Sequence, residues 1–311
     1  GLSHDPFTIV PTGDVTPVEV LLFEIRRDAH RVDLVEAENR LDGCVNVVHN
    51  LRFSPDGKLL AAGSDDSQPL VWRVADWRRV GSFDDAAGPV LDVDFSPDSS
   101  RLATAGGIFD GRWIAGHVTV ADASSGQTAW RKRTTSSRVT SVDYSAQSDM
   151  VVTGAGDGVI RVFNADDGQP IETIRAHAHV VRDVCFAHQS DALFSAGYDD
   201  AVRRWNIRQD APTNMLTGHA DEVLTIDISS DSQWLVTASP RGVKLWDVQT
   251  GRLWKQLDLP VEHFSAAAFA PGSNRLVVGG GPFPIDDQAP AYLGIWDSKW
   301  GMVHQQITGL V

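Results

Sequence analysis

The chain has 311 residues, of which 42% are hydrophobic and 22% charged, a balance typical of a globular protein with a sizeable core. Its formal net charge of −14 argues against a general nucleic-acid binder, because a phosphate backbone selects clustered Lys and Arg. No apolar run approaches the roughly 20 residues of a membrane-spanning helix, so we expect neither nucleic-acid nor membrane partners.

The chain contains only two cysteines, Cys44 and Cys185. Two cysteines without a C-x-x-C pair offer neither a disulfide framework nor a zinc site, which favours a reducing compartment, here taken as the cytoplasm. The sequence begins Gly-Leu-Ser-His without a Met, and we expect it to be a trimmed chain or part of a longer one.

The N-terminal residues predict the strands of an incomplete repeat. Residues 18–25 (VEVLLFEI) are expected to form a third strand, and residues 35–44 (VEAENRLDGC) a fourth strand and the start of the next repeat. Residues 7–10 (FTIV) predict one further strand. Extra residues at 26–34 (RRDAHRVDL) predict an insertion between the third and fourth strands.

From residue 44 onward the sequence repeats itself. Each unit has an alternating apolar strand, a turn rich in Ser, Pro, Asp or Gly, and a second apolar strand that ends in small residues. The residues that close the first strand are spaced by 42, 49, 42, 42 and 41: Phe53, Phe95, Tyr144, Phe186, Ile228 and Phe269. A second set lies on the third strand, and each of its first five members precedes the next first-strand anchor by 23 residues: Trp72, Ala121, Phe163, Trp205, Trp246 and Trp296.

A period of about 42 residues with four short strands indicates the blade of a β-propeller. The motifs resemble the WD40 repeat family: Gly218-His219 and KLWD (244–247) match its Gly-His and Trp-Asp ends, and VRRWN (202–206) and GIWD (294–297) are close variants. We therefore expect an all-β, seven-bladed propeller of WD40 type with four-stranded antiparallel blades.

This prediction makes residues 1–311 a single propeller domain, with a partial first blade at 1–43 and six complete repeats at 44–309. We expect the N-terminal strands to close the ring, because an open ring exposes strand edges.

One repeat carries the hydrogen-bonded tetrad of the family, which the resemblance assigns to His177, Ser195, Asp199 and Trp205. A catalytic Ser/His/Asp triad is the alternative. The structural role is favoured because the spacing follows the repeat and a buried, satisfied network is stabilising. Other repeats keep only parts of the tetrad: Cys44 and Ala62 replace the His and Ser in one, and Arg241 stands at the turn position in another.

Two repeats are longer than the others between their second and third strands. The inserts are residues 107–116, within AGGIFDGRWIAGHV, and 281–291 (GPFPIDDQAPA), and we expect both on one face of the propeller. Their aromatic, apolar and charged side chains are typical of interfaces and form the candidate partner-binding set: Phe109, Asp110, Arg112, Trp113, Phe283, Ile285, Asp286, Asp287 and Tyr292. An equally weighted alternative is that Phe109, Trp113 and Phe283 pack on their own loops.

Other candidate sites are weaker. The glycines at 105–118 lack the Lys-Ser/Thr end and following helix of a phosphate-binding loop. His177, His179 and His188 resemble a metal cluster, but the tetrad accounts for the first and a turn holds the last. The Asp-Asp pairs are turn residues without calcium-loop spacing. We therefore expect no metal and no cofactor.

These observations predict a non-enzymatic scaffold that binds a protein or peptide on the face that carries the two inserts. Its acidity favours a partner of basic character, and we expect a monomeric domain within a complex or a longer chain. One alternative is a regulatory or sensory domain of a larger protein, such as a kinase or a nucleotide-dependent switch. Another is an enzyme or small-molecule binder that uses the central funnel, although no ring of His, Asp or Glu lines the starts of the innermost strands.

Overall fold

A computed structural model describes residues 5–11, 20–28, 31–41, 47–81, 83, 88–110, 112–135, 137–190, 192–207, 212–257, 263–270, 275–281, 291–297 and 302–310. Every helix or strand in these ranges is a β-strand, as the all-β prediction requires. A search of the same residues for a helix long and apolar enough to cross a membrane finds none. The chain divides into two compact units, Gly1–Val139 with Ala165–Gly168, and Thr140–Asn164 with Gln169–Val311.

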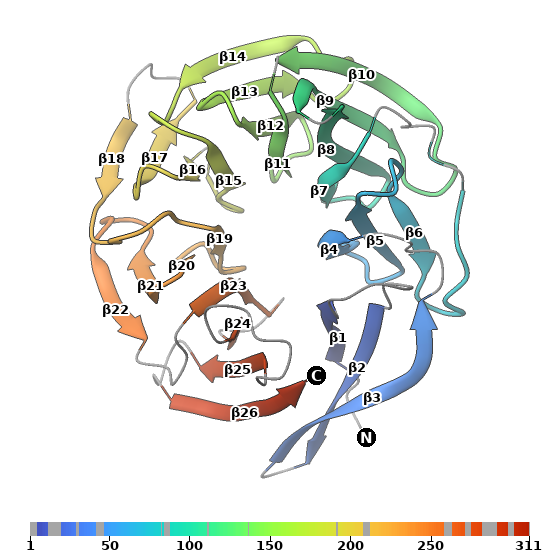
Figure 1. The fold of residues 1–311 in the computed structure, drawn as a ribbon, viewed down its shortest axis with the longest axis vertical. Coiled ribbons are helices and arrows are strands. Elements are labelled where there is room, and N and C mark those ends of the chain that lie inside the picture. The colour runs from blue at the N-terminus through green and yellow to red at the C-terminus, as the bar shows by residue number, and fades with distance from the viewer. Residues whose placement is uncertain are drawn as a thin grey trace. The chain divides into compact units, whose positions relative to one another are not determined.

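The first unit contains three antiparallel sheets (Figure 1). One has the order β1-β2-β3, with β1 (Asp5–Pro11), β2 (Val20–Asp28) and β3 (Arg31–Leu41). The next has β4 (Val48–Phe53), β5 (Leu59–Ser64) and β6 (Leu70–Arg73) in chain order. The third has the order β10-β9-β8-β7, with β7 (Val90–Phe95), β8 (Arg101–Phe109), β9 (Trp113–Asp122) and β10 (Thr128–Thr135).

The second unit contains four sheets of four strands, each in chain order. They are β11 (Val139–Tyr144), β12 (Met150–Ala155), β13 (Val159–Asn164) and β14 (Pro170–Arg175); β15 (Val181–Phe186), β16 (Ala192–Gly197), β17 (Val202–Asn206) and β18 (Pro212–Leu216); β19 (Thr225–Ile228), β20 (Trp234–Ser239), β21 (Gly242–Asp247) and β22 (Leu253–Leu257); and β23 (His263–Phe269), β24 (Arg275–Gly281), β25 (Ala291–Asp297) and β26 (Met302–Leu310).

The prediction of seven four-stranded blades is wrong. Within the described residues, β4 to β26 form six blades of three or four antiparallel strands. The first of these blades has only three strands, because β6 is followed by the isolated bridge Trp72↔Arg79 in place of a fourth strand. Whether the whole chain forms a single closed domain stays a prediction.

The N-terminal strands form a separate three-stranded sheet rather than a seventh blade. The pairing of β2 with β3 runs from Val20↔Leu41 to Asp28↔Arg31, so most of the predicted insertion at 26–34 lengthens the two strands. Alternating apolar and charged residues flank this turn, and such alternation favours continued antiparallel pairing over a loop. The resulting strands have nine and eleven residues, longer than most strands of the blades.

The turn between the first and second strands is held by a recurring serine and a nearby aspartate. In four blades the residue after the first-strand anchor is a serine whose hydroxyl accepts a hydrogen bond from the backbone amide five residues later: Ser54, Ser96, Ser145 and Ser229. Each hydroxyl donates to a nearby aspartate: Asp56, Asp98, Asp149 and Asp231. The fourth residue after the anchor has a positive φ, at Gly57, Ser99, Ser148 and Ser232, so the chain reverses tightly there.

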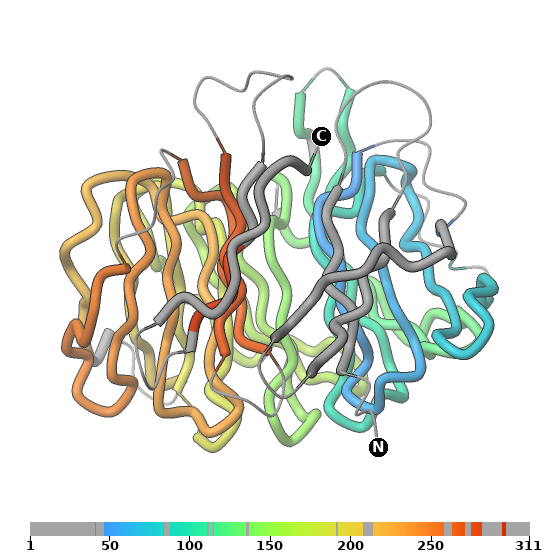
Figure 2. The backbone as a smooth tube through the Cα atoms, turned by 90° about the horizontal axis from the view of Figure 1, so that it is seen from below, coloured from blue at the N-terminus to red at the C-terminus, as the bar shows by residue number. Residues whose placement is uncertain are grey.

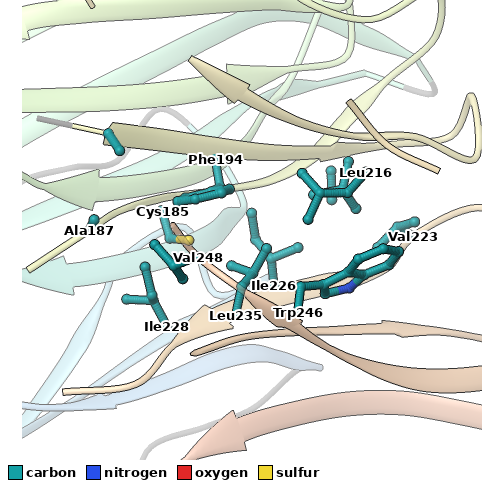
Figure 3. Close-up of a cluster of buried hydrophobic side chains, with 13 residues drawn as sticks. Cys185, Ala187, Phe194, Leu216, Val223, Ile226, Ile228, Leu235, Trp246 and Val248 are labelled. Carbon is teal, nitrogen blue, oxygen red and sulfur yellow. The ribbon is translucent and has the colours of Figure 1, made fainter. Parts of the chain in front are cut away.

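The hydrophobic core forms between adjacent blades. Figure 3 shows one such cluster in the second unit, where Phe194 and Leu216 of one blade face Ile226, Leu235 and Trp246 of the next. All five side chains are buried, and burying a side chain of this size contributes about 1.5–3 kcal/mol. Sheet-against-sheet packing of this kind requires the alternating apolar pattern that defines the repeat.

Hydrogen bonds also join the first strands of successive blades in the second unit. The amides of Phe186 and Phe269 donate to Asp143 Oδ2 and Asp227 Oδ2, each at 2.6 Å. Cys185 occupies the corresponding position of β15, and Asp183, two residues earlier, accepts from the Ile226 amide at 2.9 Å instead. These half-buried carboxylates connect neighbouring blades and satisfy backbone amides of the following strand.

Candidate partner-binding site

The four tetrad residues lie together within the blade β15–β18. The Trp205 Nε1–H donates to Ser195 Oγ at 2.9 Å, and the Ser195 hydroxyl donates to His177 Nε2 at 2.7 Å. The His177 Nδ1–H donates to Asp199 Oδ1 at 2.7 Å, and Arg203 Nη1 donates to Asp199 Oδ2 at 2.9 Å. The bonds form one continuous chain from the indole to the guanidinium, which fixes the neutral tautomer of the imidazole.

The electrostatics of this network keep the imidazole neutral and the carboxylate ionised. Burial lowers the pKa of His177, although the hydrogen bond that it donates to Asp199 opposes the shift. Burial tends to raise the pKa of Asp199, but the bonds from His177 and the Ala178 amide, with the Arg203 charge, lower it overall. Ser195 is 0% exposed and already accepts from the indole, so no substrate reaches its hydroxyl. The geometry therefore supports a structural network over a catalytic triad.

The next blade builds a related network from His219 and Trp246, which the repeat motifs indicated, and from Thr237 and Ser239, which the sequence analysis did not assign. His219 Nε2 lies 2.6 Å from Thr237 Oγ1, and His219 Nδ1 lies 2.9 Å from Ser239 Oγ. Trp246 Nε1–H donates to the same Thr237 oxygen at 2.8 Å. Thr237 follows Leu235, the partner of Trp246, by two residues, just as Ser195 follows Leu193, the partner of Trp205. The equal spacing of Thr237 and Ser195 from the tryptophan-paired leucines could have identified Thr237 from the sequence.

Arg241, at the place of the tetrad aspartate, pairs with Asp221 instead, with Nε–Oδ2 at 3.5 Å. Without a carboxylate partner, burial lowers the pKa of His219 to about 4, and the Lys244 charge adds to the shift. The imidazole is therefore neutral at physiological pH.

The insert at 107–116 is an ordered extension of the β8–β9 hairpin rather than an irregular loop. Pairing continues through Gly107↔Gly116 and Ile108↔Ala115 to Phe109↔Trp113. In Figure 2 this teal hairpin projects beyond the blue β4 and β5 strands of the same unit. The hairpin thus presents its end residues away from the blade.

Three side chains stack at this tip. The ring centroids of Phe109 and Trp113 are 5.2 Å apart, and Arg138 Cζ lies 5.5 Å from the Trp113 centroid. Trp113 is partly covered by these neighbours, whereas Phe109 is 54% exposed and Asp110 and Arg112 are exposed. Packing on its own loop therefore describes Trp113 in part, whereas the Phe109 side chain is exposed and accessible to a partner. Arg138 was not among the predicted residues.

The second insert cannot be placed in the same way. Phe283, Ile285, Asp286 and Asp287 lie outside the described residues, and Tyr292 is described only as a β25 backbone position opposite Gly280. A shared face for the two inserts therefore stays a prediction.

Two glycines at the start of the first insert, Gly106 and Gly107, allow close backbone packing. A Cβ on Gly106 would collide with the carbonyl oxygen of Pro89, and one on Gly107 would lie 2.5 Å from that of Ala115. Across the part of the chain that the structure describes, no group of three or more His, Cys, Asp or Glu side chains is arranged to hold a metal ion. His179 and His188 are exposed.

The repeated blades and their Trp–hydroxyl–His networks define a WD-repeat protein. The sequence matches the WD40 family (WD domain, G-beta repeat) over residues 38–73, 77–117, 130–164, 168–206 and 211–247, more than half of the chain. The chain therefore belongs to the WD40 family, as its motifs predicted.

Segments of the chain are similar to several characterised WD-repeat proteins. It is 29% identical over 119 residues to Actin-interacting protein 1 of Drosophila melanogaster, 36% over 67 residues to Eukaryotic translation initiation factor 3 subunit I of Caenorhabditis briggsae, and 33% over 138 residues to Small ribosomal subunit protein RACK1 of Medicago sativa. The matches cover 37%, 22% and 40% of this chain and 19%, 20% and 41% of these relatives, respectively, so less than half of each relative is spanned.

Proposed function

We propose that this chain is a non-enzymatic interaction module that binds a protein or peptide partner. The observation that carries the proposal is the β8–β9 extension, which holds Phe109 exposed beside Trp113 and Arg138. Aromatic and Arg side chains on a rigid scaffold are typical anchors of interfaces. The blade itself does not require these residues, because four other blades join the same two strands in shorter hairpins, at β5–β6, β12–β13, β16–β17 and β20–β21.

The relatives support an interaction role. Two of them are named as components of assemblies, a translation initiation factor subunit and a small ribosomal subunit protein, and the third as actin-interacting. We propose by analogy a domain that works within a protein complex in the cytoplasm. Burial of Ser195 and His177 supports the non-enzymatic part of the proposal, since their network is closed to substrates.

We further propose that the insert at 281–291 contributes to the same binding face, through Phe283, Ile285, Asp286, Asp287 and Tyr292. The net charge of −14 alone favours a basic partner. Residues 107–117 and 128–139, at and beside the hairpin tip, carry five cations and one carboxylate, so the local charge there is positive.

Affinity capture with a shortened hairpin tests the proposal. Replacing residues 109–114 with Asn-Gly joins Ile108 to Ala115, the last regular pair, by a two-residue turn and leaves the blade register intact. We expect this variant to fold with unchanged circular dichroism and to lose the proteins that the unaltered chain captures from its native source. Met215→Ser, which removes an exposed apolar side chain on β18, is the matched control and should retain them. Undiminished capture by the shortened variant would remove this surface from consideration.

A further inference from the structure

We propose that the hairpin tip and the adjoining strand β10 bind an acidic, extended segment of the partner. This inference rests on the proposed function and specifies the chemistry of the segment that the site takes.

The first argument is local charge. Residues 107–117 and 128–139 contribute five cations, Arg112, Arg131, Lys132, Arg133 and Arg138, and a single carboxylate, Asp110. The whole chain, by contrast, has a net charge of −14. A locally cationic surface favours an acidic segment, because the nearby guanidinium and ammonium groups attract carboxylates and repel a basic segment at short range.

The register of the sheet brings these cations to the aromatic tip. Arg133 lies opposite His117, and Thr135 opposite Gly116, so β10 ends beside the hairpin extension. Arg131 and Arg133 are exposed on the same face of β10, and Arg138 follows the strand and stacks on Trp113. Two further carboxylates, Asp166 and Asp167, follow Ala165, whose carbonyl accepts from Trp130 Nε1 at 2.8 Å, so they lie near the start of β10. Asp166 pairs with Arg101 at 2.9 Å, and the cations at the far end of β10 are the ones nearest the tip.

The second argument is the position of β10 at the edge of its sheet. The strand order β10-β9-β8-β7 leaves β10 with one sheet partner, β9. An extended peptide can add to such an edge through backbone hydrogen bonds, and its alternate side chains then point to one face. Carboxylates at alternate positions would meet Arg131 and Arg133, and an apolar residue at the end would meet Phe109.

Cations on an edge strand also protect against aggregation, which is the competing explanation. Edge protection requires only the charges on β10. It does not account for Phe109, which is 54% exposed, or for Arg138 on the Trp113 ring. The two explanations differ in outcome, since an edge that only repels strands binds no acidic peptide.

A phage-displayed random decapeptide library provides the test. The library is selected on the unaltered chain and counter-selected on the double variant Arg133→Glu/Arg138→Glu. Arg175→Glu, on the outermost strand β14 of another blade, is the matched charge reversal, and Arg133→Lys/Arg138→Lys preserves the charge. Circular dichroism and thermal melting establish that each variant folds.

We expect enrichment of peptides rich in Asp and Glu with at least one aromatic or aliphatic residue. Their dissociation constants should rise tenfold or more with Arg133→Glu/Arg138→Glu or with Phe109→Ser, and should change less than twofold with Arg175→Glu. The lysine variant should retain most of the affinity, and higher salt should weaken binding.

Selection of Lys- and Arg-rich peptides, or of none that distinguish the double variant, would overturn the inference. If that happened while the shortened hairpin still lost its captured partner, the proposed function would stand and only the acidic chemistry would fail. If the shortened hairpin lost nothing, the proposed function itself would fail.

Discussion

In the buried networks, different residue types make the same hydrogen bonds at equivalent positions. Ser195 and Thr237 each accept from a tryptophan indole and bond to an imidazole, although one is a serine and the other a threonine. The fourth member differs more, since Nδ1 of His177 bonds to Asp199, whereas Nδ1 of His219 bonds to Ser239. A carboxylate supports a protonated imidazole and a hydroxyl does not, so the two histidines differ in electrostatic environment.

Ser195→Ala should lower the free energy of unfolding by about 1–3 kcal/mol. The substitution leaves the Trp205 indole N–H without its acceptor and His177 Nε2 without its donor, and both lie in the interior. Urea-induced unfolding followed by tryptophan fluorescence measures the change. Thr173→Ala, at an exposed site on β14, is the control and should shift stability by less than about 0.5 kcal/mol. A loss no larger than that of the control would show that the network contributes nothing to stability.

His219 should make stability depend on pH below neutrality. Its pKa is about 4 in the folded chain and 6.5 when unfolded, so the unfolded state binds more protons between these values. The stabilisation is complete above pH 6.5 and is lost as the pH falls towards 4, by up to about 3 kcal/mol. The lowered pKa of His177 acts in the same direction. Urea titrations at pH 7.5, 6 and 5 measure the effect, and His219→Asn should flatten the profile. An unaltered pH profile in that variant would contradict the assignment.

At the scale of elements, two kinds of hydrogen bond recur in the blades: bonds that hold the turn of the first hairpin, and bonds that connect one blade to the next. In four blades a serine–aspartate turn closes the first hairpin from within. Asp143, Asp183 and Asp227 instead bond to the backbone of the following blade. Asp183 is the most connected of these, because it also accepts from the Ser141 hydroxyl of the preceding blade at 2.9 Å. One carboxylate thus joins three successive sheets.

Asp183→Ala should destabilise the second unit by about 2–3 kcal/mol, because the Ile226 amide and the Ser141 hydroxyl lose their acceptor together. Hydrogen exchange should show the Ile226 amide opening faster, beyond any change in distant strands. Asp183→Asn keeps an acceptor of similar shape and should recover much of the loss. Equal protection of Ile226 in the alanine variant would refute this connection.

At the scale of the whole molecule, the six blades differ in their number of strands and in their buried hydrogen bonds. The blade β15–β18 has four strands and a continuous tetrad network, whereas the blade β4–β6 has three strands and one bridge beyond them. An edge without a full fourth strand loses backbone hydrogen bonds and side-chain cover. Unequal blades should therefore open independently, with the least supported one first.

Amide hydrogen exchange should accordingly be faster in β6 than in β17, the equivalent third strand of the tetrad blade. The comparison is made under native conditions by mass spectrometry of peptides that cover residues 70–73 and 202–206. Exchange that was equal in the two strands, or slower in β6, would show that the fourth strand and the tetrad do not govern local stability.

The repeat, the anchor residues, the tetrad positions and the place of the insert at 107–116 could all be predicted from the sequence. These depend on alternation and turn chemistry, which act over a few residues and recur with each blade. Tertiary structure decided the rest. The N-terminal strands became a sheet of their own because β2 and β3 continue to pair, and the insert became a hairpin because Ile108 and Ala115 pair across it. Because Cys185 stands where β11 and β19 have an aspartate, Asp183 accepts the hydrogen bond from the following blade instead. Arg138 lies over the Trp113 ring, although the two residues are 25 positions apart in the chain. Such contacts join residues that only neighbouring strands bring together, and no local pattern encodes which partner lies opposite.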